Sequence, residues 1–391
     1  MAEKGDSSDE EPTIAEDVVV TKYKMAGDMS NRVLAQVLEA CVEGAVITDL
    51  CEMGDKLVLE ETKKVYKKEK NMKKGIAFPT CVSVDNCVCH FSPLKSDAPV
   101  RLKKGDLVKI ELGVHVDGFI ATMGHTLVVG SSKENKVTGR QADVMQAAYL
   151  AGEIAHRMVV PGGESIAVAN AIQKVATSFN CNAVEGIICH RLRKNCYDNE
   201  KNIILNPPPE QLKRDVKSCE FELYEAYAID ILMSTGEGKT RQADSRTTIF
   251  RKTDEVYKLK MKNSRAFYSE VCAKFTSMPF SLRACEEEAK ARMGLVECVN
   301  HNLVEPYDVI YEKDGEYVSQ IKFTLLLMPN GPQRITSGSY DPEVVSSELK
   351  LEDPELNALL TSSTSRKNKK KKKKAGKTAD TEATDTPTTE T

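Results

Sequence analysis

Hydrophobic positions in the first half of the chain change from helical to strand-like spacing. From Ser30 to Cys41, apolar residues recur at the helical period, and this pattern ends near Gly44. A second helix is expected from Thr48-Asp49, because either residue could cap its N-terminus. Strand-like runs follow this helix, at residues 77–90, 106–113 and 118–129.

The same order of elements recurs in the second half. The spacing of apolar residues from Val144 to Ala155 predicts a helix that stops at Pro161-Gly162-Gly163, and a further helix is expected from Ser165. Strand-like runs follow at residues 184–192 and 221–233. Two helices followed by strands, twice over, predict two related halves around one antiparallel-rich sheet.

A third region interrupts the second half. Residues 256–302 read as helical, with a break at Met278-Pro279-Phe280 and a restart at Ser281, which is a good N-cap. This pattern predicts a small helical insertion. A last strand over residues 317–328 returns to the sheet and ends at a turn over residues 329–332.

Charge separates the ends of the chain from its body. Residues 1–16 carry six acids and one lysine, whereas residues 361–391 carry nine basic and four acidic groups. Both segments have too few apolar residues to offset the entropy of ordering, so we expect disordered tails around a domain at residues 17–360. No apolar stretch is long enough for a membrane span or resembles a signal peptide, which predicts a cytoplasmic or nuclear protein without membrane insertion.

The twelve cysteines are expected to be reduced thiols in that compartment. Cys87-x-Cys89-His90 looks like part of a metal site, but no second ligand pair has matching spacing. We therefore expect buried, unreactive thiols there.

Short polar segments on the predicted strands occur in a fixed order along the chain: 86–93, 109–113, 189–190, 227–230 and 320–324. In this order and spacing the chain resembles type-2 methionine aminopeptidases, which also carry an insertion like that at 256–302. The resemblance covers roughly residues 15–345. It implies an α+β pita-bread fold with two pseudo-symmetric halves. The Lys-rich tail narrows the resemblance to a non-catalytic group of proliferation-associated, ErbB-receptor-binding relatives.

The resemblance also implies where a metal site would lie. The peptidases hold two divalent cations with two Asp, one His and two Glu, and a further His faces the substrate. In order, the five ligand positions fall on Glu111, Thr122, His190, Asp230 and Lys322, and the substrate-facing position falls on His90. His90 is therefore expected on the wall of the cleft.

These replacements alter the charge of the site. Two carboxylates and one ammonium sum to −1, whereas four carboxylates would balance two divalent cations. Lys322 is expected to donate to Glu111 or Asp230 and to replace the metals as counter-charge. We therefore predict no dinuclear centre, no cofactor and no catalysis; the alternative is a residual aminopeptidase with one metal on Glu111, His190 and Asp230. His125 lies on the other strand parity and is expected to be structural.

Positive charge in the C-terminal tail indicates binding to phosphate backbones, nuclear or nucleolar import, or both. The residues concerned are Arg366, Lys367, Lys369, Lys370, Lys371, Lys372, Lys373, Lys374 and Lys377. A second basic cluster, Lys63, Lys67, Lys70 and Lys74, would share one face of a helix. That face is either an RNA contact or simply solvated.

Leu356, Leu359 and Leu360 form a Leu-x-x-Leu-Leu pattern. Such a helix either docks in the groove of a transcriptional regulator or packs on its own domain. The resemblance further implies a growth regulator bound to ribosomal RNA and ribosomal particles, since peptidase relatives engage the ribosomal exit tunnel. It also implies a transcriptional corepressor or an adaptor for the cytoplasmic segment of an ErbB-type receptor, in the cytoplasm, nucleus and nucleolus.

Overall fold

The computed structural model describes residues 11–207 and 218–364, and its centre is a nine-stranded antiparallel sheet. The strands follow the order β1-β3-β4-β14-β8-β6-β7, with β15 paired to β14 and β5 paired to β8. Their bounds are β1 Lys74–Val84, β3 Leu107–Val116, β4 Phe119–Val128, β14 Val318–Met328, β8 Ala226–Ser234, β6 Ile188–Arg193, β7 Cys196–Ile204, β15 Gly331–Arg334 and β5 Asn182–Ala183.

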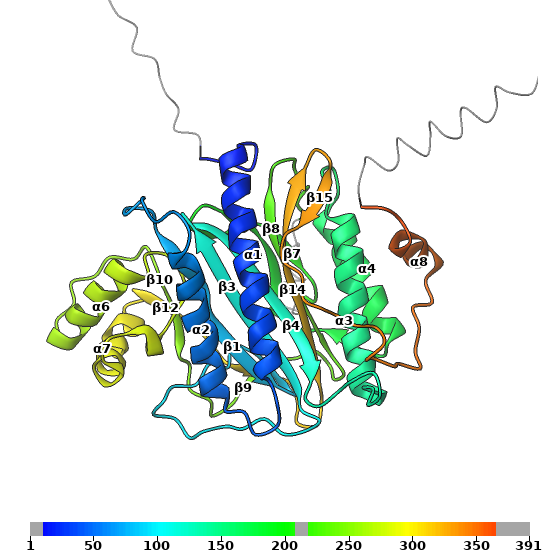
Figure 1. Ribbon diagram of the computed structural model, residues 1–391, viewed down its shortest axis with the longest axis horizontal. Helices are drawn as coiled ribbons and strands as arrows, with labels where there is room; N and C mark the ends of the chain where they lie inside the picture. The colour runs from blue at the N-terminus through cyan, green and yellow to red at the C-terminus, as the bar shows by residue number, and fades with distance from the viewer. Residues whose placement is uncertain (1–10, 208–217, 365–391) are drawn as a thin grey trace, which may run out of the picture.

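Four long helices cover one face of this sheet (Figure 1). Helices α1 (Asp17–Ala40) and α2 (Ile47–Lys63) pack on β1, β3 and β4, and helices α3 (Gly139–Met158) and α4 (Ser165–Ser178) pack on the other half. The apolar residues that face them lie at every second strand position, such as Ile110 and Leu112 under the first pair. The residues between them therefore project from the opposite face.

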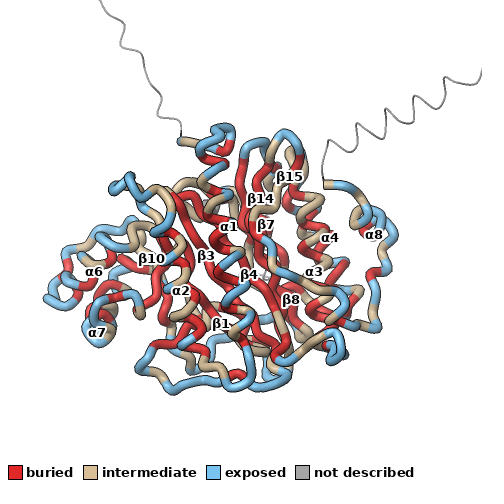
Figure 2. Tube along the Cα trace, viewed as in Figure 1, coloured by how far each residue is buried: buried red, intermediate tan, exposed pale blue. Residues whose placement is uncertain are grey.

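That opposite face carries the insertion and two small sheets. Strands β10 (Ile249–Lys252), β11 (Phe280–Ser281) and β12 (Val304–Tyr307) form one, and β2 (Cys87–Cys89), β13 (Ile310–Tyr311) and β9 (Arg241–Gln242) form the other. Helices α6 (Lys262–Lys274) and α7 (Glu288–Asn300) lie outside the first. In Figure 2 the central strands are buried throughout, whereas the insertion helices have exposed outer surfaces.

The two helix-pair halves around one antiparallel sheet, and the helical insertion, agree with the sequence prediction. Two boundaries and one helix cap were wrong. Helix α1 begins at Asp17, well before Ser30, because the β-branched run Val18–Val20 obscures a helix whose Val19 and Val20 are buried. Helix α2 begins after Val46, without a side-chain cap from Thr48. Ser281 caps the short 3₁₀ turn η1 (Leu282–Ala284), not a long helix.

The predicted partner motif lies in helix α8 (Pro354–Leu360), which packs on α3. Leu356 is buried in the core of the second half, and Leu359 and Leu360 pack partly buried against that core. The leucines thus serve their own domain, which is the second of the two alternatives. Docking in a partner's groove would require α8 to leave α3.

Three further expectations from the sequence concern the cysteines, membrane-spanning helices and the basic tail. All twelve cysteines are unpaired, and Cys87 and Cys89 are buried as predicted. Within residues 11–207 and 218–364, no helix is both long and apolar enough to cross a membrane. The basic tail residues from Arg366 onward lie outside the described residues.

Glycine in α1 permits a close backbone contact that can be tested. A Cβ atom at Gly27 would stand 2.6 Å from the carbonyl oxygen of Ile335, which as backbone cannot turn aside. We expect Gly27→Ala to lower the free energy of unfolding by about 1–3 kcal/mol in denaturant titrations. Gly152→Ala, in helix α3, is the matched control, because its nearest neighbour is the Ile321 Cγ2 methyl at 3.1 Å.

Alanine at position 152 also has the higher helix propensity, by up to about 1 kcal/mol. This gain should offset most of the energy needed to displace the Ile321 methyl group. Equal losses in the two variants would show that the backbone contact does not limit the approach of α1.

Candidate functional site

One row of paired residues crosses four neighbouring strands on the sheet face away from the long helices. Glu111 on β3 pairs with Gly124 on β4, Gly124 pairs with Lys322 on β14, and Lys322 pairs with Asp230 on β8. Paired residues of antiparallel strands project from the same face, so the three charged side chains meet there. Their neighbours Ile110, Ile229 and Ile321 project into the cores under the helices.

Lys322 bridges the two carboxylates. Its Nζ atom donates to Oε1 of Glu111 at 2.5 Å and lies 2.8 Å from Oδ2 of Asp230. The three residues are 8%, 3% and 8% exposed, in the order Lys322, Glu111, Asp230. The arrangement agrees with the predicted role of Lys322 as internal counter-charge, with both carboxylates bound at once.

Electrostatics keep this lysine charged. Burial would lower the pKa of Lys322, but the carboxylates of Asp230 and Glu111 outweigh it and raise that pKa well above its usual range. A raised folded-state pKa gives stability that is fully present below the unfolded value of about 10.4 and is lost only above it. The ammonium therefore persists throughout the neutral and acidic range.

Lys322, Glu111 and Asp230 together form an ion cluster. Two further residues complete its environment, and neither was predicted. The Nε2 group of Gln320 donates to Oδ1 of Asp230 at 2.8 Å, and the Nζ atom of Lys322 lies 5.6 Å from the centre of the Phe78 ring. Gln320 could have been found from the sequence, because it precedes Lys322 by two positions on one strand and so shares its face. Phe78 comes from the distant strand β1, and its approach depends on the fold.

Thr122, which the resemblance implied as a lost ligand position, lies in a contact between two strands. Thr122 is fully buried, and its hydroxyl has no hydrogen-bond partner among the described residues. Its backbone N–H donates to Oγ1 of Thr324 at 2.9 Å, and that hydroxyl donates back to the Thr122 carbonyl at 3.0 Å. Thr122 thus belongs to the contact between β4 and β14.

Two histidines, His90 and His190, lie around this row of charged residues. His90, in the left-handed region with φ of 65°, forms an aromatic wall with Phe78 and Tyr307 and bonds through Nδ1 to the carbonyl oxygen of Asp308. That His90 lines a cleft stays a prediction. His190 pairs with Ala228, two residues from Asp230 on the same face of β8.

His125 projects from the other face, as its strand parity predicts. A Cβ atom on Gly338 would stand 2.4 Å from its Nδ1, so the ring fills the space beside that segment. Burial lowers the pKa of His125 to about 4, which keeps the ring neutral.

These residues do not fit a dinuclear metal centre. The ammonium of Lys322 already lies between the two remaining carboxylates, and a cation there would have to displace it against charge repulsion. Across residues 11–207 and 218–364, no group of three or more His, Cys, Asp or Glu side chains is arranged to hold a metal ion.

Comparison with known proteins identifies the family. Residues 21–226 match the model of metallopeptidase family M24. The chain belongs to this family. It is 46% identical over 92% of its length to ErbB-3 binding protein 1 of Arabidopsis thaliana, of which it covers 90%. It is 42% identical to the curved DNA-binding protein of Schizosaccharomyces pombe, over 87% of this chain and 89% of that one.

A solved structure supports the same assignment. The structure of a thermophilic Arx1 superposes with a TM-score of 0.84 and 34% identity, covering 90% of this chain and all of the other. The pita-bread fold and the resemblance to ErbB-receptor-binding relatives of the peptidases are thereby confirmed.

The second basic cluster does not form the predicted helix face. Helix α2 ends at Lys63, residues 64–73 form a turn-rich connection, and Lys74 begins β1. The Nζ group of Lys74 donates to the backbone carbonyls of Val65 and Tyr66, so this lysine supports the connection instead of facing solvent with the others. The prediction of one helical face was wrong because the lysines keep a helix-like spacing beyond Lys63, where the helix itself ends.

The ion cluster makes a direct prediction about stability. Lys322→Met would leave two carboxylates buried together without a cation, which should lower the free energy of unfolding by about 3–5 kcal/mol. Lys133→Met is the control, because Lys133 pairs with Glu343 at the surface, where its side chain is 59% exposed. Denaturant titrations at neutral pH measure both.

We expect little change from the control, since solvent screens a surface pair. Comparable losses in the two variants would contradict the role assigned to Lys322.

Proposed function

We propose that this protein is a non-catalytic M24 protein that acts as an RNA- and ribosome-associated growth regulator. The single observation that supports the loss of catalysis is the bridge from Lys322 to Glu111 and Asp230. In an active peptidase of this family, metals would occupy that position and activate the attacking water. Here an ammonium group supplies the positive charge, and an ammonium cannot act as a Lewis acid that activates a coordinated water.

The proposed RNA contact is the C-terminal basic tail. Its nine basic groups between Arg366 and Lys377 include six consecutive lysines, a density suited to neutralising phosphates without reading bases. A relative named for binding curved DNA supports nucleic-acid binding in this group of proteins. Lys63, Lys67 and Lys70 remain exposed, but the helix face that suggested an RNA contact is absent.

Protein partners follow from the relatives. One relative is named for binding ErbB-3, which supports a role as adaptor for the cytoplasmic segment of an ErbB-type receptor. We extend the proposal to transcriptional corepression and to the nucleus, nucleolus and cytoplasm, because the basic tail also suits nuclear import. Use of Leu356, Leu359 and Leu360 by a transcriptional partner would need α8 to detach from α3.

Metal binding tests the loss of catalysis. Protein dialysed against Mn²⁺ or Co²⁺ and then desalted should retain no stoichiometric metal by mass spectrometry, because Lys322 repels a cation between Glu111 and Asp230. The same sample should release no methionine from the peptide Met-Ala-Ser. A type-2 methionine aminopeptidase assayed in parallel is the positive control. Stoichiometric metal together with methionine release would establish the residual aminopeptidase instead.

Salt dependence tests the RNA contact. Deleting residues 366–377 should weaken binding of ribosomal RNA about tenfold or more at physiological salt and flatten the dependence of log K on log salt, since fewer counterions are released. Deleting residues 379–390 removes the same length of chain without a basic group and is the matched control. An unchanged affinity and slope after the first deletion would favour a protein-binding adaptor that does not contact RNA.

A further inference from the structure

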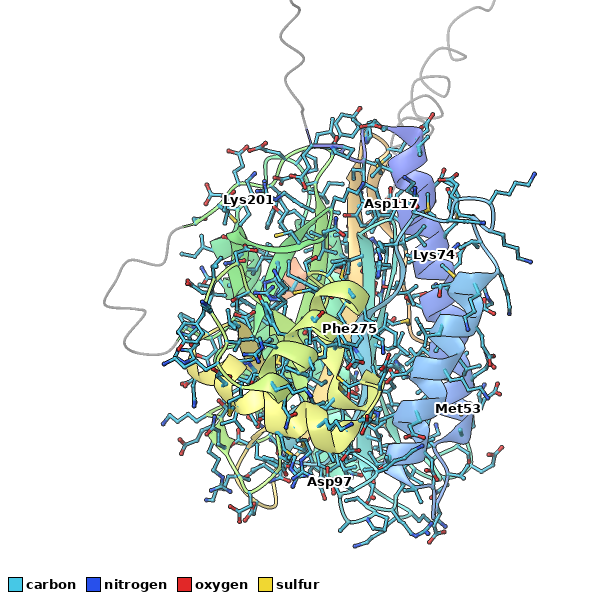
Figure 3. All side chains as sticks on the ribbon, turned by 90° about the vertical axis from the view of Figure 1, so that its left-hand side faces the viewer. Met53, Lys74, Asp97, Asp117, Lys201 and Phe275 are labelled. Atoms are coloured by element: carbon cyan, nitrogen blue, oxygen red, sulfur yellow. The ribbon has the colours of Figure 1, made fainter. Side chains whose placement is uncertain are left out.

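A groove separates the insertion from the first half of the main sheet. It has a volume of about 300 Å³ and lies between α2 and the start of β1 on one side and the end of α6 with η1 on the other. In Figure 3 the labels of Lys74 and Phe275 mark its two sides. Its apolar wall consists of Leu59, Ile76, Pro79, Phe275, Pro279 and Phe280.

The shape of this wall favours an aliphatic side chain. Leu59 is 43% exposed, a large apolar side chain open to solvent at the groove. The Phe275 ring stacks on Phe280 with centroids 4.5 Å apart and planes 6° apart, so one face of the Phe275 ring is already covered. At most one face of the Phe275 ring is left for a nucleobase, and Phe280 is 1% exposed, whereas a branched alkyl group packs well among Leu, Ile and Pro.

A buried donor faces the groove. His115 lines it, is only 7% exposed and pairs with Gly75 of β1. Burial lowers the pKa of His115 to about 4, despite Asp117 nearby, so the ring is neutral at pH 7. The Gly118 N–H donates to Nδ1 at 3.3 Å, which leaves the proton on Nε2. That N–H has no acceptor among the described residues and is available to a carbonyl or carboxylate oxygen of a ligand.

The lining of the groove has more basic than acidic residues. Lys73, Lys74 and Lys274 line it together with one acid, Asp55, which is paired with Arg283 at 2.9 Å. The chain that leads to Lys73 carries further exposed lysines without an ion pair among the described residues: Lys63 at the end of α2, and Lys67, Lys68 and Lys70 in the connection. Glu69 is the single acid of residues 63–74. A rim of this charge attracts and orients an anionic partner.

We propose that this groove is a docking site for an acidic peptide segment of a partner protein. One aliphatic side chain of the segment packs against Leu59, Ile76 and Phe275, a backbone carbonyl accepts from Nε2 of His115, and flanking carboxylates contact the lysine rim. The site is separate from the Lys322 row and does not depend on the RNA contact proposed for the tail.

A peptide selection tests this site on the full-length protein. The probe is a random library of ten-residue peptides in which acidic residues flank one variable central position. Wild-type protein should enrich Leu, Ile, Val or Met at the centre. Leu59→Glu should weaken binding of the enriched peptides about tenfold or more, because it removes apolar contact and repels the acidic flanks. Leu223→Glu is the matched control, since Leu223 is 40% exposed in the turn before β8.

Circular dichroism and thermal unfolding establish that both glutamate variants are folded. In a separate variant, replacing Lys63, Lys67, Lys70 and Lys73 by Gln should reduce the affinity for the enriched peptides at low salt. The proposal is overturned if the wild type enriches no such peptides, or if both glutamate variants bind them equally. It is also overturned if Leu59→Glu lowers affinity for oligouridylate but not for the peptides, which would assign the groove to RNA.

Discussion

The ion cluster of Lys322, Glu111 and Asp230 is the interaction on which the centre of this fold depends. It lies at the seam between the two halves, where β4 and β14 pair at a single described position, Lys322 opposite Gly124. The lysine extends from the second half to Glu111 of the first half, while it also holds Asp230 within its own half. A buried charge of either sign without a partner would be costly. The stability of each of the three groups therefore depends on the other two.

The rest of the seam follows from this arrangement. A side chain at Gly124 would stand 3.0 Å from Cβ of Lys322, so glycine is what allows the lysine to cross. On either side, hydroxyl groups take the place of ladder hydrogen bonds: Thr126 donates to the Gln320 carbonyl at 2.9 Å, and Thr324 donates to the Thr122 carbonyl at 3.0 Å. Thr122 therefore contributes to cohesion between β4 and β14.

A site stabilised in this way leaves function to the surfaces. The row is buried, and its charged side chains are paired with one another, so the surfaces of the chain are the places to look for binding sites. Two such parts differ in chemistry: a basic tail suited to phosphates, and an apolar groove with a basic rim between the insertion and β1. The groove exists because the insertion approaches α2 and β1 without filling the space around Leu59 and His115.

The sequence by itself determined the order of helices and strands and the insertion, because these depend on local period and on residue type. Its resemblance to the peptidases also led to the prediction of the altered ligand positions. From strand parity the sequence also placed His125 on the face opposite to that of Thr122. It misplaced the start of α1, where buried contacts override the β-branched run Val18–Val20, and it extended a helical period past Lys63. Only the tertiary structure decided that Lys322 binds both carboxylates, that Phe78 covers it and that the three leucines of α8 pack inward, because each depends on strands or helices distant in the chain meeting at one register.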